Sequence, residues 1–131
     1  MTTRSGPAGE IVARSGNRTH LDEDPTLHAE IIVIREAAKT LGRKNLDDCT
    51  LYGTHEPCPM CASAMIWARV KAAVSGASMA DIAQYAASSG TERWKWRTVS
   101  IPAETVFDSG EPKVEYTKEF MRADCVALFH S

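Results

Sequence analysis

The chain has 131 residues, 44% of them hydrophobic and 24% charged, with a formal net charge of -2 at pH 7. These values are typical of one globular domain over residues 1–131 and exclude a disordered chain. The slight acidic excess argues against a nucleic-acid partner, since domains that grip phosphate backbones usually have a marked basic excess. Residues 1–10 contain one Arg and no apolar run, so we expect no signal peptide, no membrane anchor and a cytoplasmic protein.

The first predicted elements are a strand and a helix. Residues 1–8 are rich in Ser, Thr, Gly and Pro and are expected to be loose and disordered, whereas Glu10–Arg14 reads as a short strand. Asp24 followed by Pro25 is typical of a helix start, with Asp as the N-cap and Pro at the first helical position. Apolar residues then recur at helical spacing, which predicts a helix over residues 25–41.

Strands and helices continue to alternate along the rest of the chain. Residues 49–54 read as a strand, a second helix begins near Pro59 and includes the apolar run 62–70, and residues 71–77 are a third strand. The remaining predictions are a helix over 79–88, an extended segment over 94–101, a short helix over 102–107 and an amphipathic helix over 117–129. This alternation indicates an α/β layered domain.

Residues with the chemistry of a metal site stand at the starts of the two clearest helices. Cys58 and Cys61 are three apart, so at a helix N-terminus both sulfurs can converge on one ion, and the helix dipole favours their thiolate form. With His28 they form a three-ligand site for one Zn²⁺ per chain, leaving the fourth tetrahedral position open, as in catalytic zinc sites. Glu30 is interpreted as an acid/base that moves protons for a water activated by the metal.

Other interpretations of these motifs remain. His55 lies three residues before Cys58, and as a fourth ligand it would close the site and make the zinc structural. A C-x-x-C pair also fits a redox-active dithiol, although that leaves His28 and Glu30 without a role. Cys49 and Cys125 are interpreted as small buried apolar residues.

The segments around these motifs resemble the cytidine-deaminase-like superfamily, whose zinc deaminases share an H-x-E and P-C-x-x-C signature. The likeness covers residues 24–30, 46–52, 56–61 and 67–69, and is strongest to the bacterial guanine deaminases and relatives that act on cytosine-like or triazine rings. It implies a three-layer α-β-α sandwich with a central mixed β-sheet, and a homodimer. It also implies that Asn17 hydrogen-bonds the base and that Trp67 faces its ring, while His55 is expected to contact the substrate if it is not a ligand.

The chain departs from that family at three places. Family members usually have a helix and a strand before the segment matching residues 10–17, and this chain is expected to lack them. Guanine deaminases carry an acidic pair where residues 87–90 read Ala-Ser-Ser-Gly, which favours a smaller ring than guanine. The basic and aromatic run 93–97 could stack on nucleic acid, but an amphipathic strand is the favoured interpretation. Members of the family commonly close the pocket with C-terminal residues, and the resemblance makes Trp94, Trp96, Phe129 and His130 the candidates in this chain.

The function predicted from the sequence is therefore zinc-dependent hydrolytic deamination of a free nucleobase-like heterocycle, in purine or pyrimidine metabolism. Cytosine, isocytosine or an aminotriazine is the expected substrate, and ammonia the expected product. Three alternatives remain: a guanine deaminase, a tRNA adenosine deaminase and a non-catalytic zinc-binding protein.

Overall fold

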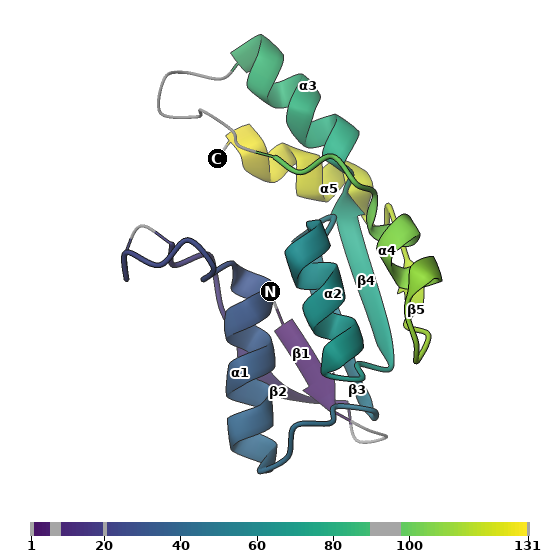
Figure 1. Ribbon diagram of the computed structural model, residues 1–131. Coiled ribbons are helices and arrows are strands. Elements are labelled where there is room, and N and C mark those ends of the chain that lie inside the picture. Colours follow the sequence, from purple (N-terminus) through teal and green to yellow (C-terminus); the bar gives the residue numbers. More distant parts are fainter. Residues whose placement is uncertain (1, 6–8, 20, 90–97, 131) are drawn as a thin grey trace.

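A mixed sheet forms the centre of the molecule. The computed structural model describes residues 2–5, 9–19, 21–89 and 98–130 (Figure 1). Its five strands have the order β2-β1-β3-β4-β5, with β1 antiparallel to β2 and β3, and β3, β4 and β5 parallel to one another. The strands are β1 (Thr2–Ser5), β2 (Glu10–Arg14), β3 (Cys49–His55), β4 (Ala72–Ala77) and β5 (Glu115–Thr117). The predicted α/β fold with a mixed sheet is confirmed.

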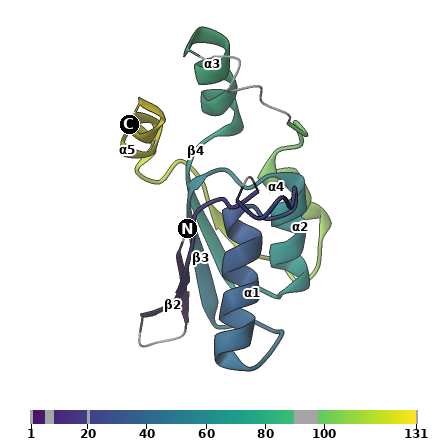
Figure 2. The same ribbon diagram turned by 90° about the vertical axis from the view of Figure 1, so that its left-hand side faces the viewer.

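Helices lie on both faces of this sheet. They are α1 (Ala29–Leu41), α2 (Pro59–Trp67), α3 (Met79–Ser89), α4 (Ala103–Ser109) and α5 (Arg122–Ala127), the last followed by a 3-10 turn at Leu128–His130. Helices α1 and α2 cover one face and α5 lies on the opposite side, which gives three layers (Figure 2). Helix α3 extends beyond the carboxyl end of β4 (Figures 1 and 2). None of the helices in the described ranges is long and apolar enough to cross a membrane.

The main core lies between the sheet and helices α1 and α2. Its largest fully buried side chains are Leu46, Leu51, Met65, Val33 and Val70. A smaller cluster of Ala77, Ile82 and Phe129 joins the end of β4 to α3 and the C-terminal turn. Helix α5 packs closely on β4. A methyl group added at Gly76 in β4 would lie 2.2 Å from the sulfur of Cys125 in α5, so only a residue without a side chain fits there. The core thus fixes α1 and α2 side by side, and this brings their N-termini together.

Part of the N-terminal segment that was predicted to be loose forms a strand. Residues Thr2–Ser5 form β1, which pairs with β2 on one side and with β3 on the other. The strand expected to be missing before residues 10–17 is therefore present. The sequence of this segment, Thr-Thr-Arg-Ser, has no alternation of apolar and polar residues, so periodicity could not reveal it.

The first helix starts later than predicted, at Ala29 instead of residue 25. Asp24 does cap the backbone there, but it closes a turn: its Oδ1 accepts hydrogen bonds from Thr26 N at 2.9 Å and Thr26 Oγ1 at 2.6 Å. An Asx turn and a helix N-cap use the same side-chain oxygen, so the sequence pattern is shared by both. As a result His28 is the N-cap residue of α1.

The last predicted helix, over residues 117–129, is divided. Its first residue ends strand β5, and α5 begins only at Arg122. Between them Glu119 and Met121 have φ of 58° and 51°, in the left-handed region that interrupts a right-handed helix. In the predicted extended segment 94–101, residues 98–101 form no strand and residues 94–97 lie outside the described part of the chain.

Candidate metal centre

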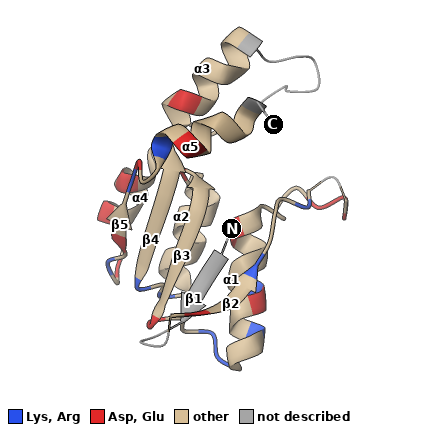
Figure 3. Ribbon diagram, turned by 180° about the vertical axis from the view of Figure 1, so that it is seen from behind, with Lys and Arg blue, Asp and Glu red and all other residues tan. Residues whose placement is uncertain are grey.

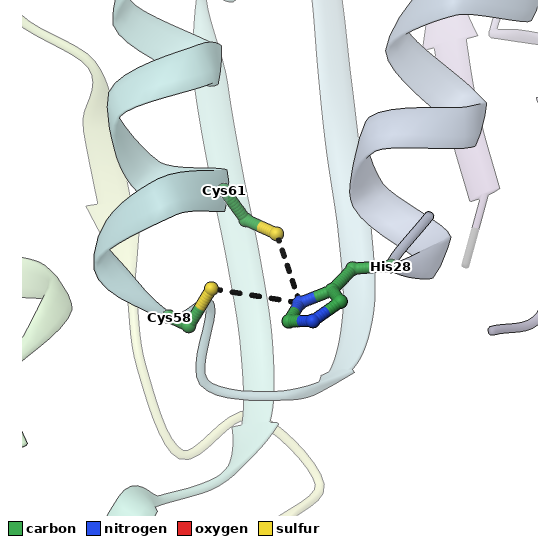
Figure 4. Close-up of side chains that lie close together, drawn as sticks. All are labelled: His28, Cys58 and Cys61. Atoms are coloured by element: carbon green, nitrogen blue, oxygen red, sulfur yellow. Dashed lines mark hydrogen bonds between the residues drawn. The ribbon is translucent and has the colours of Figure 1, made fainter. Parts of the chain in front are cut away.

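Three metal-binding side chains meet where two helices begin. His28 is the N-cap of α1, Cys58 is the N-cap of α2, and Cys61 lies in the first turn of α2. Both helix starts lie near the carboxyl end of β3 (Figure 1). His28 Nδ1 is 3.6 Å from Cys58 Sγ and 3.6 Å from Cys61 Sγ, and all three side chains point toward one another (Figure 4).

The spacing of these atoms fits a zinc ion. The three ligand atoms lie within 4.8 Å of one another. Zinc binds sulfur at about 2.3 Å and imidazole nitrogen at about 2.0–2.1 Å, so at the tetrahedral angle the nitrogen and each sulfur are about 3.6 Å apart. The two N···S distances match that value. One imidazole and two thiolates are also a common zinc donor set, and three protein ligands leave a fourth position for water or substrate.

The two thiols share a proton unequally. A hydrogen bond from Cys61 lowers the pKa of Cys58 to about 5, with a further contribution from His28. The same hydrogen bond, together with burial, raises the pKa of Cys61. One thiolate is therefore present at neutral pH without a metal, and a bound cation must displace the proton of the second thiol.

Glu30 lies beside the metal ligands without belonging to them. It is the second residue of α1 and is partly buried. Burial raises the pKa of its carboxyl group, and a hydrogen bond with Cys61 partly opposes the rise. On a regular helix residues i and i+2 face different directions, but His28 is the cap residue and Glu30 follows in the first turn, so both can act at the helix end. A carboxyl group with a raised pKa is suited to accept and donate a proton.

His55 is close in sequence but is not part of the ligand group. It ends β3, and its ring packs against Phe129 with 5.2 Å between ring centroids. Its Nδ1 lies 2.7 Å from Thr54 Oγ1, and burial lowers the pKa of the imidazole. Among the described residues, the ligand group contains only His28, Cys58 and Cys61, so a fourth ligand from His55 has no support.

Asn17 and Trp67 do not belong to the ligand group, and their predicted contacts with a substrate stay predictions. Asn17 lies on an exposed loop, where its Oδ1 accepts hydrogen bonds from Thr19 N and Thr19 Oγ1, each at 2.9 Å. Trp67 is the last residue of α2, and 86% of its surface is exposed. The length of the helix places it about 13 Å from Cys58. Trp94, Trp96 and the His130 side chain lie outside the described part of the chain.

Sequence reasoning gave no role to Glu56, although its carboxylate makes two hydrogen bonds to distant parts of the chain. Its Oε1 accepts from Met79 N at 3.1 Å and its Oε2 from Ala103 N at 2.9 Å. Only the position of Glu56 immediately before the Pro-Cys pair hinted at a function.

Known proteins are similar to this chain in sequence and in fold. Over 76 residues the chain is 49% identical to a guanine deaminase from Bacillus subtilis, covering 58% of this chain and 49% of that protein. Over 69 residues it is 51% identical to a tRNA-specific adenosine deaminase from Agrobacterium fabrum, covering 53% and 45%. The chain thus spans about half the length of these curated relatives.

A solved structure of a guanine deaminase from Nitrosomonas europaea has the same fold, with a TM-score of 0.76, 22% identity, and coverage of 98% of this chain and 69% of that one. The family model for the cytidine and deoxycytidylate deaminase zinc-binding region matches residues 6–77, more than half of the chain, and this range includes the three ligands and Glu30. The chain therefore belongs to the zinc-binding cytidine and deoxycytidylate deaminase family.

Proposed function

We propose that this protein is a zinc-dependent deaminase that hydrolyses the exocyclic amino group of a free heterocyclic base and releases ammonia. The observation that carries the proposal is the three-ligand cluster with a partly buried carboxyl group beside it. His28, Cys58 and Cys61 leave one metal position open, and Glu30 adjoins Cys61 with a raised pKa. A structural zinc site would need a fourth protein ligand and would have no use for that carboxyl group.

The roles of the side chains follow from their chemistry. His28 Nδ1 and the two cysteine sulfurs would hold the ion, which supplies Lewis-acid activation of water when bound. Glu30 accepts a proton from the attacking water and donates it to the ring nitrogen or the leaving amine. The ring carbon exchanges its bond to nitrogen for a bond to oxygen, so the products are the oxo ring and ammonia.

Charge, sequence and similarity to known proteins all bear on the substrate. The net charge of -2 favours a small uncharged ring over a polynucleotide. The replacement of an acidic pair by residues 87–90 favours cytosine, isocytosine or an aminotriazine, whereas similarity to a guanine deaminase favours guanine. Deamination of adenosine in tRNA is a second candidate, because similarity to a tRNA-specific adenosine deaminase is equally high.

The test is an ammonia-release assay with zinc-loaded protein. The substrates are guanine, cytosine, isocytosine, an aminotriazine, cytidine, adenosine and a tRNA anticodon stem-loop. We expect release from at least one free base and none from the stem-loop. Turnover of the stem-loop alone would favour tRNA editing, and no turnover of any substrate by the zinc-loaded protein would favour a non-catalytic zinc protein.

The matched variants are Glu30→Gln and Glu36→Gln, which change two carboxylates of the same helix. Glu36 is exposed, so its loss should leave turnover unchanged. Loss of the proton-moving carboxylate should lower kcat by about 10²-fold or more while zinc stays bound. Full activity of Glu30→Gln would refute this mechanism, and equal loss of zinc and activity would make Glu30 a ligand.

We also propose that the protein forms a homodimer through α2. Trp67 lines a groove of about 450 Å³ together with Ile66 and Val106, and α2 has no charged residue. A twofold interface needs a surface complementary to itself, and exposed tryptophans are enriched at interface centres. Sedimentation velocity should give a dimer for the wild type and for Val99→Lys, an exposed apolar site outside the groove, but a monomer for Trp67→Lys. A monomeric wild type would refute the proposal.

A further inference from the structure

Glu56 connects three segments that are far apart in the sequence. Its carboxylate accepts hydrogen bonds from Met79 N at 3.1 Å and Ala103 N at 2.9 Å, which are the first residues of α3 and α4. Its own backbone N–H donates to Ala77 O at 2.7 Å. Residue 56 is thereby tied to the end of β4 and to the starts of two helices.

Helix chemistry makes these contacts strong. The first N–H groups of a helix have no partner inside the helix, and the helix dipole favours a negative charge there. Helix α3 has its own capping pair, because Ser78 and Asp81 exchange hydrogen bonds of 3.0 and 3.1 Å. Helix α4 begins after Pro102, which makes no side-chain cap hydrogen bond. Glu56 is thus the side chain that caps α4 in the described structure.

The loop that Glu56 fixes carries a metal ligand. Glu56 is two residues before Cys58, and the residue between them is the buried Pro57, whose ring fixes φ. Few free torsions therefore separate the fixed carboxylate from the Cys58 sulfur. The other ligand of this helix, Cys61, is held by the buried face of α2 and does not depend on the loop.

We infer that Glu56 is a positioning residue of the metal centre, which holds Cys58 in place by fixing its loop to the starts of α3 and α4. This inference rests on the proposed zinc site. Glu56 is not a member of the ligand group among the described residues, so its effect passes through the backbone of residues 56–58. If Glu56 only stabilised the fold, its substitution would lower the melting temperature but would not change the zinc affinity at temperatures well below the melting temperature.

The test compares zinc affinity in two variants that both weaken the start of α3. Glu56→Gln keeps the size of the side chain but removes its negative charge. The amide NH2 of the glutamine would also lie against a backbone N–H, of Ala103 or of Met79, and two donors cannot form a hydrogen bond. Asp81→Asn disturbs the other cap of α3 and leaves the loop of residues 55–58 untouched. Zinc affinity is measured by competition with a chelator at 15 °C, without substrate, and the melting temperature is measured separately on the metal-free proteins.

We expect Glu56→Gln to lower zinc affinity about tenfold or more, as for other groups that orient metal ligands indirectly, and Asp81→Asn to change it less than about twofold. Glu56→Asp, which keeps the charge but has a shorter reach, should lie between them and replaces Glu56→Gln if that variant does not fold. Unchanged zinc affinity in the Glu56 variants, or an equal loss in Asp81→Asn, would overturn the inference. A wild type that binds no zinc would overturn the proposed function as well.

Discussion

A methyl group at Gly76 tests how tightly the C-terminal helix packs on the sheet. The new Cβ would lie 2.2 Å from Cys125 Sγ, 2.7 Å from Cys125 Cβ and 3.0 Å from Thr54 O. Non-bonded carbon atoms pack at about 3.5–4.0 Å, so α5 must move away from β4 by more than about 1 Å. Such a shift strains the hydrogen bonds and ion pair between Asp81 and Arg122, which hold the basic start of α5 to the acidic start of α3 (Figure 3).

Overpacking of this kind costs about 1–3 kcal/mol, and we expect the upper end because one of the neighbours is a backbone oxygen. For a chain of this size a loss of about 3 kcal/mol lowers the melting temperature by about 10 °C. The control is Gly16→Ala, since a Cβ at Gly16 meets nothing within 4 Å. That variant should stay within about 0.5 kcal/mol of the wild type in urea denaturation.

A double-mutant cycle then identifies the clashing partner. Cys125→Ala removes the sulfur that lies 2.2 Å from the added methyl group, and leaves the contacts at 2.7 and 3.0 Å. The free energy of unfolding of the Gly76→Ala, Cys125→Ala double variant should exceed that of Gly76→Ala alone, with a coupling of at least about 1 kcal/mol. Additive effects of the two substitutions would refute the packing of α5 on β4.

Three further outcomes follow from single groups. A hydrogen bond with Arg122 holds the pKa of Asp81 well below the ordinary value of a carboxyl group, so the pair stabilises the fold at neutral pH and less as the pH falls into the acid range. Asp81→Asn should therefore lower the free energy of unfolding by about 1–2 kcal/mol at pH 7, with a smaller difference at pH 3 in urea titrations; a constant difference would contradict this. Arg69, just after α2, has φ of 57°, in the left-handed region that glycine adopts without strain. Arg69→Gly should therefore stabilise the fold by about 1 kcal/mol and raise the melting temperature by a few degrees. A lower melting temperature would contradict this and would show that the Arg side chain makes a stabilising contact. Zinc affinity in chelator competition should fall about tenfold per pH unit from pH 8 to 6, because the proton of Cys61 competes with the metal. Below pH 5 the fall should be steeper, because Cys58 also becomes protonated. A zinc affinity that does not change with pH would argue against thiolate ligands.

The sequence predicts the ligand cluster well because its signal is local. The spacing of Cys58 and Cys61 at a helix start, with His28 at another, requires only two helices packed side by side. Their apolar faces, visible as periodicity, provide that packing. The raised pKa of Glu30 could not be predicted, since it arises from burial in the folded chain.

Features that depend on distant partners were missed. Strand β1 has a polar sequence and exists because β2 and β3 both pair with it. Helix α5 is shorter than its apolar pattern because Glu119 and Met121 adopt left-handed φ, which no residue type there demands. Glu56 hydrogen-bonds residues 23 and 47 positions away, and nothing in the sequence marks those partners.

The two zinc-site helices begin on residues that are poor helix caps. His28 and Cys58 are the N-caps of α1 and α2, and neither makes the side-chain hydrogen bond that Ser, Thr, Asp or Asn would provide. That omission costs each helix about 0.5–2 kcal/mol, and the free energy of metal binding can offset it. Zinc supply should therefore govern how long the folded chain persists. In a metal-starved cell both helix starts would fray more often, and the chain would be degraded faster than its metal-loaded form.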